Sequence, residues 1–186
     1  KKAVLVVISS DKGLCGSYNS QLAKKVRRFL DETDLDVKVF FIGKKVRDLL
    51  ASTYNKGKTF TFAKTEPTFV EMENVGVELG ELFTTGEVGK IFVAYNIFNS
   101  AISFDPEVKQ LLPLTLDQAE KEELAEIIEK GPQAAGFSGG CWRSPMIAEL
   151  VKKKYGVKYS VFYIAELLKN MGFSFQKARF ISDHLD

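Results

Sequence analysis

Hydrophobic and polar positions alternate between two patterns along the first 114 residues. Continuous apolar runs of strand length suit strands that are buried on both faces, and apolar residues spaced three and four apart suit amphipathic helices. The pattern predicts strands over 3–8, 36–42, 58–62 and 90–96, and helices over 20–30, 44–51 and 68–83. Because strands alternate with helices, we expect right-handed crossovers and an α/β fold, a three-layer, open, mainly parallel sheet that is Rossmann-like.

Two of these predicted helices differ in how well their sequences suit an amphipathic helix. The helix over 20–30 keeps its lysines and arginines largely off its apolar stripe, which is formed by Leu22, Val26, Phe29 and Leu30. The helix over 68–83 carries two glycines, which weaken a helix. Its apolar residues are Val70, Val75, Val77, Leu79 and Leu82.

The pattern of apolar residues changes after Leu114. Three short helices are predicted over 116–129, 146–155 and 161–171, with a basic, alternating β segment over 173–181. Ser144-Pro145 is typical of a helix start with proline in the first turn, and Ser160 can cap the third helix. Helix, loop, helix, glycine turn, helix and basic strand is the order of a small winged helix-turn-helix domain. The alternative is a three-helix protein-interaction module with a solvated lysine face.

Charge is balanced over the whole chain but not locally. The sequence has 26 basic and 24 acidic residues, whereas residues 136–180 have eight basic residues against two acidic ones, a local net charge of +6. A basic block of this size indicates binding to a polyanion, and a solvated lysine face is the competing interpretation.

Chemistry-bearing motifs are sparse. The glycines of the loop over 9–19 match neither GxxxxGK[ST] nor GxGxxG, so a tight turn is favoured over a nucleotide site and no cofactor is expected. Cys15 and Cys141 are far apart in sequence and the single histidine is His184, so we expect no zinc site, disulfide or thiol nucleophile. No apolar run has the length of a membrane span, and the short β-branched run over 3–8 is interpreted as a strand and not as a signal peptide. Because the spacing of the cysteines indicates no disulfide framework, the expected location is the cytoplasm.

The loop and several later phrases carry a family resemblance. Residues 4–19, VLVVISSDKGLCGSYN, resemble the strand-loop opening of the central α/β domain in the γ subunit of F-type ATP synthases. The resemblance continues through 43–45, 95–102 and 111–114 and thus covers residues 1–114.

The γ resemblance implies a non-catalytic rotor-foot domain that contacts the ε subunit and the membrane ring, without membrane insertion of its own. The expected location is then the periphery of the membrane if the chain is assembled in an ATP synthase. It also implies a shaft of two long helices wound into a coiled coil. The sequence has no heptad pattern of that length, so rotary coupling by this chain is not expected.

A second resemblance covers residues 116–186. The phrases at 136–137, 141–148, 154–160 and 167–177 resemble the winged helix-turn-helix region of mariner-like bacterial insertion-sequence transposases. Those enzymes cut DNA with a downstream acidic triad that holds two metal ions, and no such domain follows here. The resemblance therefore implies a segment that binds duplex DNA and does not cut it.

Together these observations predict a non-enzymatic chain of two domains, 1–114 and 115–186, fused by a natural or engineered event. The residues expected to face DNA are Arg143, Lys152, Lys153, Ser160, Tyr163, Lys169, Lys177 and Arg179. Trp142 is interpreted as a core or cap aromatic, and the outward Val161 and Phe162 argue against base readout through hydrogen bonds. The alternative function is a structural component of the ATP synthase central stalk, involved in proton-driven ATP synthesis, with an incidental C-terminal tail.

Overall fold

The chain divides into two compact units, Lys1–Thr115 and Leu116–Asp186. The computed structural model describes residues 1–13 and 16–174. Each unit has its own buried apolar residues. The change of hydrophobic pattern after Leu114 therefore coincides with the division between the units.

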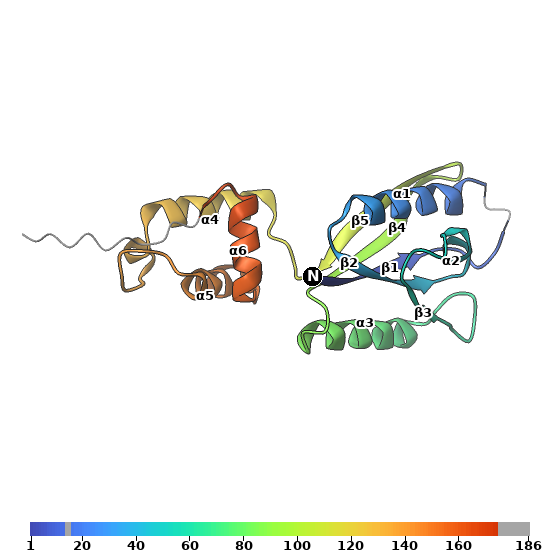
Figure 1. The fold of residues 1–186 in the computed structure, drawn as a ribbon, viewed down its shortest axis with the longest axis horizontal. Helices are drawn as coiled ribbons and strands as arrows, with labels where there is room; N and C mark the ends of the chain where they lie inside the picture. The colour runs from blue at the N-terminus through green and yellow to red at the C-terminus, as the bar shows by residue number, and fades with distance from the viewer. Residues whose placement is uncertain (14–15, 175–186) are drawn as a thin grey trace, which may run out of the picture. The chain divides into compact units, whose positions relative to one another are not determined.

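One five-stranded sheet forms the frame of the first unit, with strand order β3-β2-β1-β4-β5 (Figure 1). The pairs β1–β2, β1–β4 and β2–β3 are parallel, and β5 is antiparallel to β4. The strands are β1 (Lys2–Ile8), β2 (Asp36–Ile42), β3 (Lys56–Phe60), β4 (Lys90–Ser100) and β5 (Ser103–Leu112). The predicted α/β fold with a mainly parallel sheet is confirmed.

Helices cover both faces of this sheet. Figure 1 shows α1 (Tyr18–Glu32) and α2 (Lys45–Leu49) on one face and α3 (Phe69–Thr84) on the other. Leu5 and Val7 of β1 belong to the core beneath α1, whereas Val4 and Val6 belong to the core beneath α3. Because β1 is central and buried on both faces, its sequence is apolar without alternation.

The edge strand β5 has no counterpart among the predicted strands. Its sequence, SFDPEVKQLL, mixes charged residues with Pro106, and none of its side chains is fully buried. Proline lacks the N–H that a central strand must donate, but an edge strand tolerates it. Because β5 lies at the edge of the sheet and is not fully buried, its sequence does not need the apolar pattern from which the other strands were predicted.

The outer side of α3 is less polar than expected. Of the five apolar residues noted in this helix, Val75 and Leu79 are buried, whereas Val70 is 62% exposed and Val77 is 55% exposed. Helical geometry turns these two valines away from the sheet. The helix begins with a capping box, in which Thr68 and Glu71 each bond the other's backbone N–H.

The second unit consists of short helices, and the three predicted ones are confirmed. They are α4 (Gln118–Lys130), α5 (Ser144–Tyr155) and α6 (Val161–Asn170), with the 3₁₀ turn η1 (Gln133–Ala135) after α4. Their inward side chains include Leu124, Ile147 and Ile164, all at or below 1% exposure. Ser160 caps α6, since its Oγ accepts a hydrogen bond of 3.2 Å from the Tyr163 N–H.

Two details of the second unit differ from expectation. Arg143, and not Ser144, is the N-cap of α5, and no side chain caps that helix. The predicted β segment over 173–181 falls mostly outside the described residues, and Phe173 and Ser174 are not in a strand. Over 116–174 the unit is therefore entirely helix and loop, without the wing of a winged helix. Within the described part of the chain, no helix combines the length and apolar character of a membrane span.

Candidate functional site

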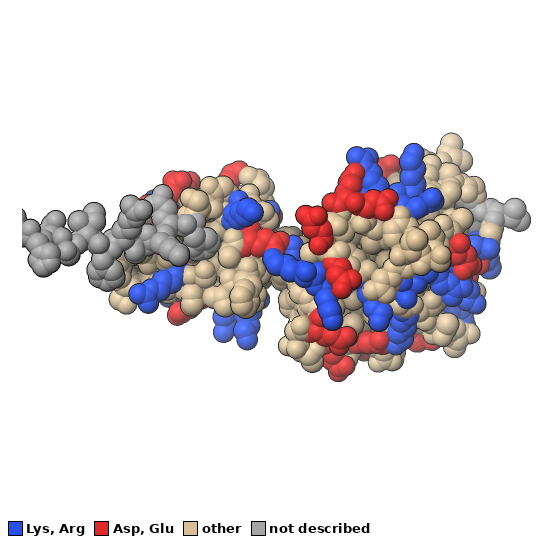
Figure 2. Space-filling view, viewed as in Figure 1, with Lys and Arg blue, Asp and Glu red and all other residues tan. Residues whose placement is uncertain are grey.

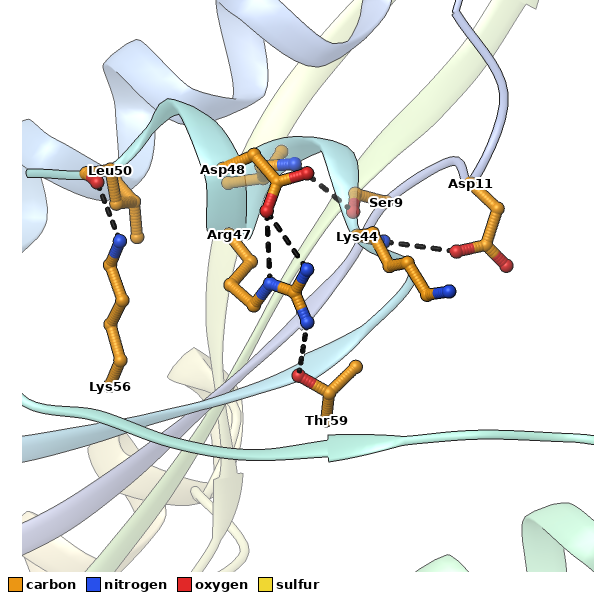
Figure 3. A network of polar contacts seen from close by, with 9 residues as sticks. Ser9, Asp11, Lys44, Arg47, Asp48, Leu50, Lys56 and Thr59 are labelled. Carbon is orange, nitrogen blue, oxygen red and sulfur yellow. Dashed lines mark hydrogen bonds and ion pairs between the residues drawn. The ribbon is translucent and has the colours of Figure 1, made fainter.

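The loop after β1 lies at the carboxyl edge of the parallel sheet, where α/β folds bind ligands. Its polar side chains are occupied by the chain's own backbone (Figure 3). The Ser9 Oγ accepts a hydrogen bond of 3.4 Å from the Val46 N–H, and the Asp11 carboxylate accepts one of 3.1 Å from the Lys44 N–H. These contacts position the start of α2 against β1.

The nearby cations are also engaged in holding the fold. Two guanidinium nitrogens of Arg47 lie 2.9 and 3.0 Å from an Asp48 carboxylate oxygen, and a third donates to the Thr59 Oγ1 at 3.4 Å (Figure 3). The Lys56 ammonium donates to the Leu50 carbonyl at 2.7 Å. Arg47 and Lys56 thus connect α2 with β3 and do not converge on an empty site.

Two asparagines complete this edge of the sheet. The Asn19 Oδ1 accepts a hydrogen bond of 3.2 Å from the Ser10 N–H, and the Asn96 Nδ2 donates one of 3.0 Å to the Tyr18 carbonyl. The Asn96 Oδ1 is buried and has no hydrogen-bond partner among residues 1–13 and 16–174. The loop therefore has a structural role, while Cys15 lies outside the described residues and the absence of nucleotide binding stays a prediction.

Metal binding finds no support in the residues that the structure describes. Over 1–13 and 16–174, no group of three or more His, Cys, Asp or Glu side chains is placed to hold an ion.

A cleft of about 660 Å³ lies between the start of α1 and the turn of the β4–β5 hairpin. Tyr18 and Phe104 line it, with their rings edge to face at 5.0 Å, and Phe98 packs on Phe104 at 5.7 Å. Serine hydroxyls from the β1–α1 loop supply its polar lining. None of the described residues that line the cleft is charged, so this lining suits an apolar group.

Beside this cleft, the hairpin exposes large apolar side chains. We call Ile97, Phe98 and Ile102 the hairpin tip; they are 40%, 68% and 95% exposed. Ile97 and Phe98 are consecutive in β4 and so point to opposite faces of the sheet, and exposed apolar side chains gathered around one turn indicate an interaction site. The sequence contains a signal for this surface, because Ile102 stands in a turn next to Asn99 and Ser100, where polar residues are usual.

The predicted DNA-facing residues of the second unit differ in exposure. Arg143, Lys152, Lys153, Ser160 and Lys169 are exposed, and Figure 2 shows blue side chains at several separate places on the face of this unit that is in view. Tyr163 is half-buried, with its ring 4.7 Å from the Tyr159 ring, and Lys177 and Arg179 lie outside the described residues. The structure thus places exposed cations on the last turns of α5 and α6 and before α5.

One lysine of the basic run serves packing instead. The Lys154 ammonium lies 2.8 Å from a Glu123 carboxylate oxygen, and this hydrogen bond lowers the pKa of Glu123. The Tyr155 hydroxyl donates to the same carboxylate at 3.1 Å and lies 3.2 Å from the Glu120 carbonyl. Burial, followed by the Glu123 contact, raises the pKa of Tyr155. These contacts join α4 to α5.

Phe162 is the most exposed large apolar residue of α6. It is 84% exposed in the first turn, and Val161 beside it is 42% exposed. The outward orientation predicted for both residues is confirmed. The interpretation of Trp142 as a cap aromatic is also confirmed, because its Nε1 donates to the Ile128 carbonyl at 2.8 Å.

Comparisons with known proteins agree on one family. The family model described as "ATP synthase" matches residues 1–179. The ATP synthase gamma chain of Anaeromyxobacter sp. is 40% identical over 119 residues, which are 61% of this chain and 41% of that protein. The mitochondrial ATP synthase subunit gamma of Pichia angusta is 35% identical over 133 residues, 69% of this chain and 48% of that protein.

The chain spans less than half the length of these two relatives. A solved structure of the Tetrahymena thermophila mitochondrial ATP synthase, central stalk and c-ring, is 19% identical with a TM-score of 0.47, covering 92% of this chain and 75% of that one. None of these matches is a transposase, so the DNA-binding interpretation of residues 116–186 stays a prediction.

Proposed function

The chain belongs to the ATP synthase family, and from this membership we propose that it is a non-catalytic, γ-like component of the central stalk. Its proposed activity is subunit binding by the α/β unit. The gamma chains of Anaeromyxobacter and Pichia angusta, as its relatives, support the γ assignment. The γ subunits that residues 1–114 resemble contact an ε subunit and the membrane ring. The partners proposed for this chain are therefore an ε-type subunit and the ring.

One observation carries the proposal, namely the exposed hairpin tip beside an uncharged cleft. Phe98 and Ile102 project from a hairpin that Tyr18 and Phe104 support from within the unit. Aromatic side chains in the centre of an interface contribute most of its binding energy. The polar groups of the neighbouring loop bond to backbone, as expected of a scaffold that supports a contact surface.

Binding of the full chain to purified ε subunit and to purified c-ring tests this proposal. We expect at least one of them to bind, and Phe98→Ser with Ile102→Ser to weaken that binding by at least about tenfold. Leu49→Ser is the matched control, because Leu49 is 47% exposed on α2 and lies outside the hairpin. Absence of binding to both partners, or equal binding by the double variant, would refute the proposal.

DNA binding by the second unit is a second candidate function. The observation that favours it is the pair Lys152 and Lys153 on the last turn of α5, both exposed, followed by the left-handed Gly156 turn and the capped start of α6. A helix pair joined by a glycine turn, with cations toward one end, is the geometry by which helix-turn-helix proteins meet the phosphate backbone.

A gel-shift titration of the full chain on duplex DNA at about 50 mM salt tests the second candidate. Each lost phosphate contact should flatten the slope of log K against log salt by roughly 0.9, so Lys152→Ala with Lys153→Ala should flatten it by up to about two. Ser160→Ala and Tyr163→Phe should alter sequence preference more than salt response. Lys24→Ala with Lys25→Ala, on exposed positions of α1, is the charge-matched control. No shift, or the same loss in both double variants, would rule out this DNA site.

A further inference from the structure

The outer face of α3 has a composition that its own fold does not explain. Phe69, Val70 and Val77 are 83%, 62% and 55% exposed. Val70 and Val77 lie opposite the buried Val75 and Leu79, and Phe69 lies on the flank of the helix between the two sides. None of them contributes to the core beneath the helix. Three exposed large apolar side chains on one helix indicate a surface that another molecule covers.

The spacing of this face is that of a helix-packing seam. We call the pair Val70 and Val77 the seam, because they are seven residues apart and so lie on one side of the helix, one heptad apart; Glu73, Gly80 and Thr84 flank this pair. Apolar residues seven positions apart are typical of a helix that packs against another helix. Packing against a strand or a lipid surface does not require a seven-residue repeat of apolar positions. The face covers most of a 16-residue helix, long enough for about two heptads.

Gly76 and Gly80 lie beside this seam, and no residue that the structure describes packs closely against either position. A Cβ placed on either glycine would meet no atom within 4 Å. Each glycine in a helix interior costs about 1 kcal/mol relative to alanine. Their absence of side chains leaves a shallow strip along which a second backbone can approach the apolar residues.

The charge of α3 indicates which kind of partner helix can bind to its outer face. The sequence of α3 contains four glutamates and no lysine or arginine. Glu71 is bound in the capping box and Glu78 in an ion pair with Lys58, whereas Glu73 and Glu81 are exposed and make no ion pair in the described part of the chain. Exposed carboxylates beside the seam disfavour DNA and anionic lipid and favour lysine or arginine on the partner.

We propose that this outer face of α3, defined by Phe69, Val70, Glu73, Val77 and Glu81, binds an amphipathic helix of a partner polypeptide whose apolar stripe is flanked by basic residues. The apolar seam supplies contact area, and Glu73 and Glu81 set partner choice in the manner of flanking charges in coiled coils. This surface is on a different element from the hairpin tip and does not depend on the stalk proposal.

A pair of matched peptides tests this inference with the full chain. Both probes are amidated helical peptides of about 20 residues with the same leucine and alanine stripe, one flanked by lysine and the other by glutamate. Fluorescence anisotropy at about 50 mM salt measures their binding. We expect the lysine probe to bind at least about tenfold more tightly than the glutamate probe, and Val70→Ser with Val77→Ser to remove that binding.

Charge exchange provides the decisive variant. Glu73→Lys with Glu81→Lys should reverse the preference, so that the glutamate probe binds better, whereas Asp31→Lys with Glu32→Lys on α1 should leave it unchanged. Circular dichroism checks that each variant is folded, and Glu73→Gln with Glu81→Gln replaces the exchange if that variant does not fold; it should abolish the preference. Equal binding of both probes, or a preference that survives these changes, would overturn the proposal. Dimerisation of the chain that Val77→Lys abolishes, without probe binding, would also overturn it by assigning the face to a second copy.

Discussion

Gly43 lies so close to Ser9 that a Cβ at position 43 would be 2.0 Å from the Ser9 carbonyl oxygen. Its φ of +87° is in the left-handed region that favours glycine. The contact brings the ends of β1 and β2 together, and the Ser9 N–H donates to the Ile42 carbonyl at 2.7 Å across the same junction. The loops that follow β1 and β2 at the carboxyl edge of the sheet therefore depend on the close contact between Gly43 and Ser9.

Gly43→Ala should therefore destabilise the first unit strongly. The left-handed φ costs about 1–2 kcal/mol for a residue with a Cβ, and relief of the clash with backbone adds about 1–3 kcal/mol. Urea denaturation measures the loss. Gly80→Ala is the control, because its Cβ meets nothing within 4 Å, and we expect it to stabilise the chain by about 1 kcal/mol. Equal stability of the two variants would contradict the assigned role of Gly43.

Limited proteolysis should cut the segment between the two units first. Leu114 is 58% exposed, and residues 114–117 belong to no helix or strand. Thermolysin, which cleaves before large apolar residues, should release a stable fragment that ends near residue 113. Mass spectrometry identifies the ends. A digest that first cleaves within β4 or α3, and leaves 112–117 intact, would contradict the division into two units.

The sequence predicts buried elements better than exposed ones. β1, β2 and α1 were predictable because complete burial requires apolar residues at every inward position, such as Leu5 and Leu22. The strand β5 was not, because Pro106 and its charged neighbours fit an edge that no pattern requires to be apolar.

The candidate surfaces were harder to predict, since apolar residues on a surface look like core residues in a sequence. Val70 and Val77 join Val75 and Leu79 in one apolar set until the helix direction is known. Phe98 and Ile102 likewise belong to a phrase that suggested family membership and not exposure. The Ser160 cap was predictable because capping depends on local sequence, whereas the ion pair of Lys154 with Glu123 joins residues far apart in sequence.

Trp142→Phe should destabilise the second unit by about 1–2 kcal/mol. The change keeps an aromatic ring near Phe137, 5.7 Å away, but removes one of two donors to the Ile128 carbonyl, the other being the Gly131 N–H at 3.1 Å, and leaves a gap where the indole was. Thermal denaturation followed by circular dichroism measures the effect. Phe162→Ala serves as the comparison, since an 84% exposed side chain should contribute within about 0.5 kcal/mol. A larger loss for Phe162→Ala than for Trp142→Phe would reverse this assignment of core and surface.

Alkaline pH should destabilise the second unit through the buried Tyr159 and the half-buried Tyr155. Burial is the main cause that raises the pKa of Tyr159 to about 12, and it also raises the pKa of Tyr155 above the ordinary value of 10. Above pH 10 the unfolded chain releases phenolic protons that the folded unit retains, so the unfolded state binds fewer protons and stability falls as pH rises toward 12. Below pH 10 both states are protonated and this contribution is fully present.

The variant Tyr155→Phe tests this explanation, because it removes one of the two phenols. Between pH 10 and 12 the melting temperature of the variant should fall less steeply than that of the parent chain. At neutral pH the variant should melt at a lower temperature than the parent, because the hydrogen bond to Glu123 is lost. The near-ultraviolet absorbance of tyrosinate should appear together with unfolding, and full ionisation of both tyrosines at pH 10 in the folded protein would show that neither phenol is held neutral by burial.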